Sequence, residues 1–180
     1  MSFTRHLALC LGISCLASAQ ETAGLAVQVH LLAPLQNLRD ANGGKPGGGL
    51  SLAVNFPLED GWSWRIDLGH DRFPKGSKAG VTDVTSEVDV SHLAVEGIYQ
   101  LRDVPGPYVF AGLGAYSWYV KETDAFLGFS TSRRVAHAGA SLGFGYRITP
   151  NLDVEIRGMG GKVDPTFTAG WAGVAAAWRF

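Results

Sequence analysis

Histidine, serine and carboxylate side chains are the residues of this sequence whose types suit hydrolytic chemistry. His137 and Ser141 lie four residues apart, as do His92 and Glu96, so each pair shares one face of an extended strand. At about 3.3 Å per residue the two partners lie roughly 13 Å apart, far beyond hydrogen-bond distance. A triad would have to be assembled across strands, and the sequence predicts no catalytic residue.

The spacing of histidines and glycines likewise gives no sign of a metal or cofactor site. The histidines that follow the N-terminal stretch show no paired metal-ligand spacing; they are His30, His70, His92 and His137. The glycine-rich segment 43–49 lacks the P-loop spacing and the Ser or Thr after its lysine, so we interpret it as a flexible surface loop. We expect neither a metal nor a cofactor.

Charged side chains form a balanced set on alternate positions of several segments. Four arginines stand against four carboxylates: Arg65, Arg147, Arg157 and Arg179, with Asp67, Glu96, Asp153 and Glu155. The positions between them are apolar, so the charges are expected to share one enclosed face. There they must pair, because an unpaired buried charge costs several kcal/mol.

Composition limits the class of protein. The chain has 180 residues, 46% hydrophobic and only 17% charged, with a net charge of −1. This length fits one domain, and the charge fraction is below the roughly 25% of soluble domains. Disorder and a nucleic-acid-binding surface are both disfavoured, and no nucleic-acid partner is expected.

Eight segments alternate apolar and other residues with period two, which predicts strands. They are 25–31, 50–56, 62–68, 93–101, 108–118, 136–146, 152–156 and 172–180. In the fifth segment the outward set is taken as Tyr108, Phe110, Gly112, Gly114, Tyr116 and Trp118. Outside the N-terminal stretch the chain has no run of eighteen apolar residues, so a helical membrane span is excluded.

The connectors alternate between short and long. Segments 57–60, 102–106 and 149–151 are tight turns, whereas 35–47, 72–86 and 121–132 are longer, with 162–167 a short fourth loop. This alternation predicts an all-β fold, an eight-stranded antiparallel up-and-down transmembrane β-barrel with its long loops outside.

Aromatic residues at the ends of the apolar faces favour a membrane barrel over a soluble one of lipocalin type. Trp62, Tyr108, Tyr146 and Trp178 are expected in one interfacial girdle, with Tyr116 and Trp118 near the other. A soluble barrel would instead turn its apolar face inward around a greasy ligand, and its surface would be unusually poor in charge.

The N-terminal stretch has the features of an export signal. Arg5 and His6 precede an apolar run over 7–16, and segment 17–19 supplies the small residues needed for cleavage before Gln20. A lipoprotein signal ending at Cys15 is the alternative, although Gly12 stands where a large aliphatic residue is usual. We expect a cleaved signal peptide over 1–19 and a barrel domain over 20–180.

Three motifs resemble the small outer-membrane β-barrel family of OmpA, OmpX and OmpW type. They are the segments 107–114 and 143–152 and the terminal Trp178-Arg179-Phe180. The resemblance covers the whole chain after the signal and implies the outer membrane as its location. It also implies insertion by the barrel-assembly machinery, with Trp178 and Phe180 as the assembly signal.

These features predict a protein with a polar, plugged lumen and an envelope-structural or surface-interaction role, without catalysis. The expected partners are outer-membrane lipids and lipopolysaccharide, whose phosphates could meet Arg133, Arg134, Lys75 and Lys78 at the outer rim. The alternatives are a narrow OmpW-like channel for small hydrophobic solutes and, with less support, a lipid-modifying enzyme. The sequence names no ligand.

Turn geometry predicts which charges meet. A turn at Thr149-Pro150 sets Arg147 opposite Asp153, and closure of the next loop near Asp164 sets Asp153 beside Arg179 and Glu155 beside Ala177. Asp153 should therefore lie between two arginines. Its replacement by alanine should destabilise the protein more than that of Asp164.

Overall fold

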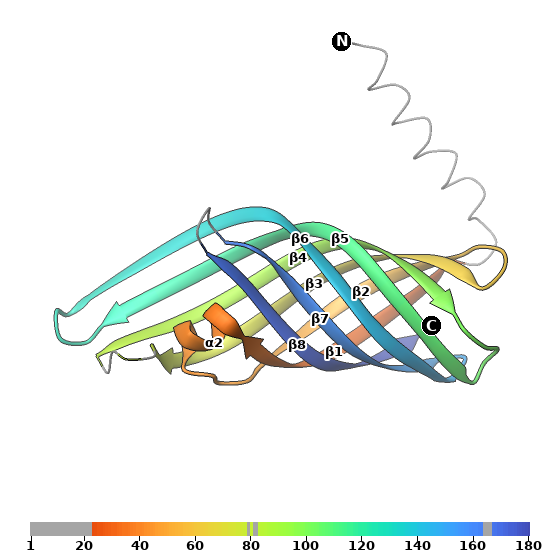
Figure 1. Ribbon diagram of the computed structural model, residues 1–180, viewed down its shortest axis with the longest axis horizontal. Coiled ribbons are helices and arrows are strands. Elements are labelled where there is room, and N and C mark those ends of the chain that lie inside the picture. The colour runs from red at the N-terminus through yellow and green to blue at the C-terminus, as the bar shows by residue number, and fades with distance from the viewer. Residues whose placement is uncertain (1–22, 79, 81–82, 164–166) are drawn as a thin grey trace, which may run out of the picture.

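The computed structural model describes residues 23–78, 80, 83–163 and 167–180. Within these ranges eight antiparallel strands pair in chain order, and the last strand closes on the first (Figure 1). The strands are β1 (Gly24–Leu35), β2 (Gly47–Pro57), β3 (Trp62–Ser77), β4 (Val84–Gln100), β5 (Gly106–Asp124), β6 (Phe129–Thr149), β7 (Leu152–Lys162) and β8 (Thr168–Arg179). The expected up-and-down barrel is confirmed. The expected signal peptide and Asp164 lie outside the described residues.

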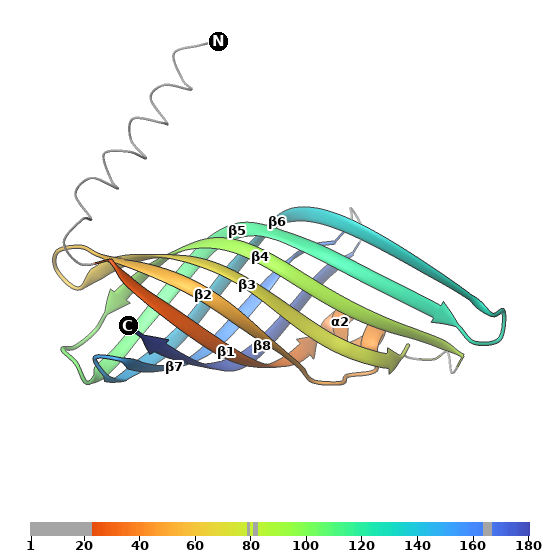
Figure 2. The ribbon, with the colours of Figure 1, turned by 180° about the vertical axis from the view of Figure 1, so that it is seen from behind.

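The strands differ in length, and the longest project beyond the barrel. β5 has 19 residues and β6 has 21, whereas β7 and β8 have 11 and 12. A membrane crossing takes about 9–11 residues. β6 pairs with β7 only from Gly139 onward, so its first part continues with β5 as a hairpin past the barrel rim (Figures 1 and 2).

Two of the expected loops are therefore shorter in the structure than the sequence predicted. Segment 121–132 is mostly strand and leaves only residues 125–128 between β5 and β6. Within 72–86, β3 runs to Ser77 and β4 begins at Val84. These strand ends carry polar residues on both faces, so the period-two apolar pattern that marks the membrane-facing part stops before the hydrogen-bonded ladder does.

The connector between β1 and β2 contains a short helix, α2 (Gln36–Asn42), where only a loop was expected from the sequence. Gly43 follows it in the left-handed conformation (φ 68°), and the Gly44 N–H bonds the Arg39 carbonyl at 2.8 Å. The glycine-rich segment expected as a loop is partly strand, since β2 begins at Gly47.

The registers at β7 agree with the prediction on one side only. Between β6 and β7, Arg147 stands opposite Asp153, as expected. Between β7 and β8, Asp153 pairs with Ala177 and Glu155 with Ala175, a shift of two residues from the prediction. The predicted register would set Lys162 opposite Gly170, whereas Lys162 pairs with Thr168.

The expected outward faces are observed in seven segments, and the assignment for β5 is wrong. Trp62, Tyr146 and Trp178 lie on the outer surface as predicted. The residues of β5 placed outside instead point into the barrel, where four of them are buried: Tyr108, Phe110, Tyr116 and Trp118. Opposed residues of an antiparallel pair share a face, and Glu96 opposes Gly112, so the even-numbered residues of β5 face inward.

Candidate functional site in the barrel lumen

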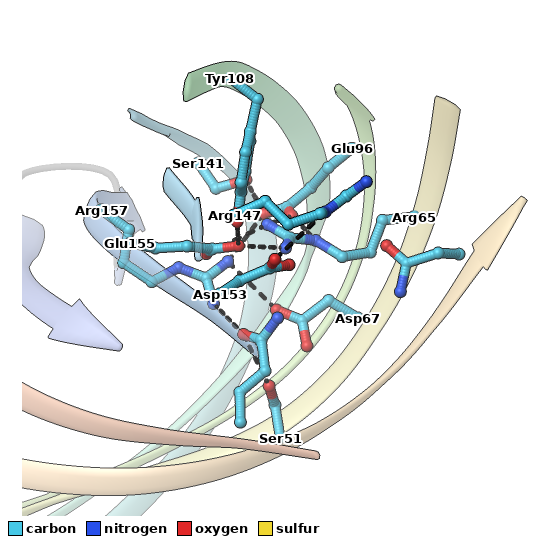
Figure 3. A network of polar contacts seen from close by, with 12 residues as sticks. Ser51, Arg65, Asp67, Glu96, Tyr108, Ser141, Arg147, Asp153, Glu155 and Arg157 are labelled. Carbon is cyan, nitrogen blue, oxygen red and sulfur yellow. Dashed lines mark hydrogen bonds and ion pairs between the residues drawn. The ribbon is translucent and has the colours of Figure 1, made fainter. Parts of the chain in front are cut away.

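Arg65 on β3 lies at the centre of the buried charges (Figure 3). Its Nε donates to Glu96 Oε2 on the adjacent β4 at 2.6 Å. On the other side its guanidinium pairs with the carboxylate of Glu155 on β7, which is not a neighbouring strand. One guanidinium thus connects opposite walls of the barrel, with all three side chains almost completely buried.

Arg157 on β7 provides a second connection across the lumen. Its Nη2 donates to Glu96 Oε1 at 2.9 Å and to Asp67 Oδ2 at 3.1 Å, and its Nη1 donates to Gln28 Oε1 at 2.9 Å. Both guanidinium groups make cation–π contacts with the Phe110 ring. Arg65 Cζ lies 4.7 Å and Arg157 Cζ lies 5.5 Å from the ring centroid. Both arginines therefore have carboxylate and aromatic partners inside the barrel.

Two neutral hydroxyl groups donate further hydrogen bonds to the carboxylates of Glu155 and Glu96. The Tyr108 hydroxyl donates to Glu155 Oε1 at 2.7 Å, and the Ser141 hydroxyl donates to Glu96 Oε1 at 2.6 Å. Such bonds to ionised groups are the stronger hydrogen bonds of proteins. The structure therefore surrounds each of these carboxylates with several donors.

Asp153 lies between two arginines near the short turns. Arg147 Nε donates to its Oδ1 at 3.2 Å, while Arg179 Nε and Nη2 approach its Oδ2 at 2.7 and 2.5 Å. Asp153 is buried, whereas the arginine side chains retain 18% and 16% exposure. Arg179 reaches Asp153 although its register differs from the predicted one, because its long side chain spans the two-residue shift.

Small residues make the space that these side chains occupy. A Cβ on Gly145 would collide with the Tyr108 ring, and one on Gly143 would collide with the Phe110 ring. Each glycine stands directly opposite its aromatic residue on the neighbouring strand. Alternation of glycine on β6 with aromatic residues on β5 therefore lets the rings lie flat along the inner wall.

A serine, a histidine and an aspartate meet across strands in the order of a hydrolytic triad. Ser51 Oγ lies 3.3 Å from His30 Nε2, and His30 Nδ1 lies 2.9 Å from Asp71 Oδ1. All three are buried, and the Ser51 hydroxyl also contacts Gln28. The pairs considered from the sequence do not form a site: Ser141 binds Glu96, and His137 is exposed on the projecting part of β6.

The lumen near the long loops has a different filling. Trp118 and Trp171 contact edge to face with centroids 5.4 Å apart, and Tyr116 and Phe73 lie against Trp171 at 6.1 and 6.0 Å. These rings belong to a buried apolar cluster that includes Leu38 of α2. The alternation of the sequence did not indicate this cluster, because it placed the β5 aromatic residues on the outer surface.

Helix α2 is fixed to the barrel end by three kinds of contact. Leu38 is buried in the apolar cluster, the Ser86 hydroxyl donates to the Ala41 carbonyl at 2.6 Å, and Asn37 Nδ2 donates to the Thr168 carbonyl at 2.8 Å. These contacts join α2 to β4 and β8, so the β1–β2 connector extends over the barrel mouth (Figure 1).

The described ranges contain neither a metal site nor a membrane-spanning helix. No group of three or more His, Cys, Asp or Glu residues there is arranged to hold a metal ion. No helix in this part of the chain is long and apolar enough to cross a membrane.

Comparison with known proteins identifies the family. The family model described as "Outer membrane protein beta-barrel domain" matches residues 6–180. The chain belongs to this family. It is an outer-membrane β-barrel protein, as the resemblance of its motifs predicted. Among curated proteins, none matches the chain.

Solved structures show the same fold at low sequence identity. Ail, the attachment invasion locus protein of Yersinia pestis, superposes with a TM-score of 0.63 at 14% identity, covering 88% of this chain and 97% of Ail. Neisserial surface protein A superposes with a TM-score of 0.54 at 13% identity, covering 88% of this chain and 97% of that protein. A major outer membrane protein from Thermus thermophilus superposes with a TM-score of 0.54 at 14% identity, covering 89% of this chain and 100% of that protein.

Proposed function

We propose that this outer-membrane barrel has a closed lumen and an envelope-structural or surface-interaction role. The observation that carries the proposal is the contact of Arg65 with Glu96 on one wall and Glu155 on the other. An eight-stranded barrel has an interior just wide enough for side chains to fill. A charged bridge across an interior of that width supports a lumen closed to ions.

The apolar cluster supports the same proposal at the other end of the lumen. Trp118 and Trp171 are fully buried there, and Leu38 of α2 adds to them from the β1–β2 connector. A solute passing through would have to displace first this cluster and then the paired charges. The apolar cluster and the paired charges are therefore two successive barriers to a solute.

Conductance in planar lipid bilayers tests the closed lumen. We expect no steady single-channel current from the full barrel or from a variant in which residues 36–46 are replaced by a short Gly-Ser linker. The variant removes α2 but keeps the bridge of Arg65. A steady current from the unaltered protein would overturn the proposal and favour the narrow channel for small solutes.

The surface-interaction role is assigned to the end of the barrel with the long loops. Phe126, Leu127 and Phe129 are exposed at the tip of the β5–β6 hairpin, with Phe126 82% exposed. Large apolar side chains at a projecting tip are typical of contact surfaces. Ail, which shares the fold, has been solved with the heparin analogue sucrose octasulfate.

Lipopolysaccharide is the partner proposed for the basic residues beside this hairpin. Arg134 lies over the Tyr119 ring at 5.5 Å and Lys75 lies near the end of β3, so both cations are on the same end of the barrel. We expect Arg134→Gln with Lys75→Gln to weaken binding to lipopolysaccharide vesicles, because phosphate contacts are lost. Arg102→Gln, at the opposite end, is the control, and equal losses from both proteins would contradict this assignment.

Export and assembly are proposed to use the two chain ends. Segment 1–19 has the pattern of a cleaved signal, and Trp178 and Phe180 place aromatic rings on the outer face of the last strand. The Phe180 N–H also bonds the Leu25 carbonyl at 2.9 Å, where β8 meets β1. Deletion of Phe180 should reduce heat-modifiable protein in the outer membrane while leaving export intact. Unchanged assembly in the deletion variant would contradict the role of Phe180 as an assembly signal.

We propose that the Ser51, His30 and Asp71 arrangement is part of the lumen filling and has no hydrolytic role. Attack by a serine needs an acyl group beside Oγ, but Ser51 is only 3% exposed and its hydroxyl already contacts His30 and Gln28. A fluorophosphonate probe should leave the folded protein unlabelled. Labelling that Ser51→Ala abolishes would overturn this proposal.

A further inference from the structure

Asp71 on β3 is a buried carboxylate that no arginine of the described ranges reaches. The lumen holds five buried carboxylates, and four arginines pair with all of them except Asp71. The carboxylates are Asp67, Asp71, Glu96, Asp153 and Glu155, and the arginines are Arg65, Arg147, Arg157 and Arg179. Asp71 instead contacts two histidines, His30 and His92. Because a buried charge without a counter-charge is costly, one of these histidines is expected to be a cation.

The contacts of His30 identify it as the neutral histidine. Its Nδ1 lies 2.9 Å from Asp71 Oδ1, so this nitrogen carries the hydrogen and donates it. Its Nε2 lies 3.4 Å from Arg157 Nη1, which can only donate, so Nε2 has to accept. Gln28 Oε1 is also 3.4 Å from Nε2, but this oxygen already accepts from Arg157 at 2.9 Å. His30 therefore has one ring hydrogen and no charge.

His92 on β4 meets a carboxylate at each of its ring nitrogens. Nε2 lies 3.5 Å from Asp67 Oδ2 and Nδ1 lies 3.6 Å from Asp71 Oδ2, and neither nitrogen has a hydrogen-bond partner in the described ranges. A neutral imidazole would direct the lone pair of one nitrogen at an ionised oxygen, whereas an imidazolium directs an N–H at both. The geometry therefore matches a ring that is protonated at both nitrogens.

The position of the His92 ring is fixed by its neighbours. Gly69 stands directly opposite His92 on β3, midway in sequence between Asp67 and Asp71, and a Cβ there would collide with the ring. The ring also stacks on Tyr116 of β5, with 5.8 Å between the centroids. This packing holds the ring over Gly69 and between the two carboxylates.

Other titratable groups face His92 from the surrounding strands. They are His30 on β1, Glu96 on β4 itself, Tyr116 on β5 and Arg157 on β7. Arg157 disfavours a second cation nearby, but its guanidinium is shared between Glu96 and Asp67. Asp71 is thus left with His92 as its source of positive charge.

We propose that His92 is held in the folded barrel as an imidazolium cation between Asp67 and Asp71, and that its proton makes the stability of the barrel depend on pH. Loss of this proton at higher pH leaves Asp71 without a positive partner and weakens the folded state. The proton comes from the solvent, and a histidine of the unfolded chain is mostly neutral at about pH 7.5, so folding takes up one proton there. The inference goes beyond the role proposed above and holds whether or not the lumen conducts.

Nitrogen-15 NMR of histidine-labelled protein in lipid nanodiscs tests the charge directly, because protonated and bare ring nitrogens resonate far apart. At about pH 7.5 we expect two protonated nitrogens on His92, and one protonated and one bare nitrogen on His30. The two sets of signals are assigned by their loss in His92→Gln and in His30→Gln. In Asp71→Asn the lumen charge is balanced without the extra proton, so His92 should show one bare nitrogen.

Urea unfolding in phospholipid vesicles gives a second readout. Between about pH 7 and pH 8 the unfolding constant of the unaltered protein should rise close to ten-fold, the value for one proton released on unfolding. The rise should be much smaller in His92→Gln and in Asp71→Asn, which nearly keeps the shape of the aspartate. His70→Gln, exposed on β3, is the control and should keep the full rise.

Two results would overturn the proposal. The first is a bare ring nitrogen on His92 of the unaltered protein in the NMR experiment. The second is an equal rise of the unfolding constant in the unaltered protein, His92→Gln and Asp71→Asn. If His92→Gln fails to fold, Asp71→Asn alone gives the comparison, and the His92 signals are assigned by their change in that variant.

Discussion

The lumen near the short turns and the lumen near the long loops are both filled, but by different interactions. The first holds Arg65, Arg157 and their carboxylates, each with several polar partners. The second holds Trp118, Trp171 and their apolar neighbours, whose polar atoms have none among the described residues. We call the first the polar layer and the second the apolar layer.

This difference predicts two kinds of response to substitution. In the polar layer each group depends on the position and charge of another, so removal of one partner leaves the other buried and unpaired. In the apolar layer the contribution of a side chain depends mainly on the volume it fills. Matched substitutions in the two layers can therefore separate pairing from packing.

The largest effect is expected from the central arginine. Arg65→Leu keeps an apolar stem but leaves Glu96 and Glu155 without their main partner, and should lower the free energy of unfolding by about 4 kcal/mol. Arg72→Leu is the control on the same strand. Arg72 also pairs with two carboxylates, of Glu87 and Asp89, but is 64% exposed. It should cost about 1 kcal/mol or less.

Urea unfolding of both variants in phospholipid vesicles, followed by tryptophan fluorescence, gives this comparison. A loss at Arg65 no greater than that at Arg72 would show that burial adds nothing to the bridge. It would remove the distinction between the polar layer and an ordinary surface ion pair.

A second large effect is expected at the edge of the polar layer. Asp153→Ala leaves Arg147 and Arg179 facing each other, and should lower the free energy of unfolding by about 3 kcal/mol. The two arginines retain some contact with water, so the loss should be smaller than at Arg65. Asp103→Ala, in the exposed turn after β4, should change stability by no more than about 0.5 kcal/mol in the same assay. Equal losses would contradict the pairing.

In the apolar layer the expected loss follows volume. Leu38→Ala removes the buried anchor of α2 and should cost about 2 kcal/mol, the low end for such changes, because the connector can relax. Leu35→Ala, exposed at the end of β1, is its control and should cost little. Amide hydrogen exchange should show faster exchange in α2 of the first variant alone. Unchanged protection there would mean that Leu38 does not hold the helix.

The sequence predicted the polar layer well because charge marks the inner face without ambiguity. Arg147 and Asp153 are joined by a turn of few residues, so their register followed from the turn itself. The register of β7 with β8 depended on a loop whose centre the sequence does not mark, and it was wrong by two residues. The pairing of Asp153 with Arg179 nevertheless formed, because a long side chain tolerates such a shift.

The apolar layer was not predictable in the same way. Both faces of β5 are apolar, with Val109 and Leu113 on one and Tyr108 and Trp118 on the other, so alternation alone cannot tell lumen from lipid. The decisive signal is the pairing of Glu96 with Gly112, which carries the inward face from β4 to β5. Helix α2 was also missed, since its tertiary contacts outweigh a weak local pattern.

Two tyrosines on this same strand give the smallest and most direct test of the difference between the layers. Tyr108 donates its hydroxyl hydrogen to Glu155 at 2.7 Å, whereas the Tyr116 hydroxyl is buried with no partner in the described ranges. Tyr108→Phe leaves a carboxylate short of one donor, and should cost about 1.5 kcal/mol. Tyr116→Phe removes a buried polar atom that has no hydrogen-bond partner in the described ranges, and should leave the free energy of unfolding unchanged or raise it slightly. The two variants delete the same atom from the same strand, so urea unfolding in vesicles compares polar pairing and apolar packing directly. An equal loss in both would mean that the Tyr116 hydroxyl has a partner, and that the upper part of the lumen is not an apolar layer at that position.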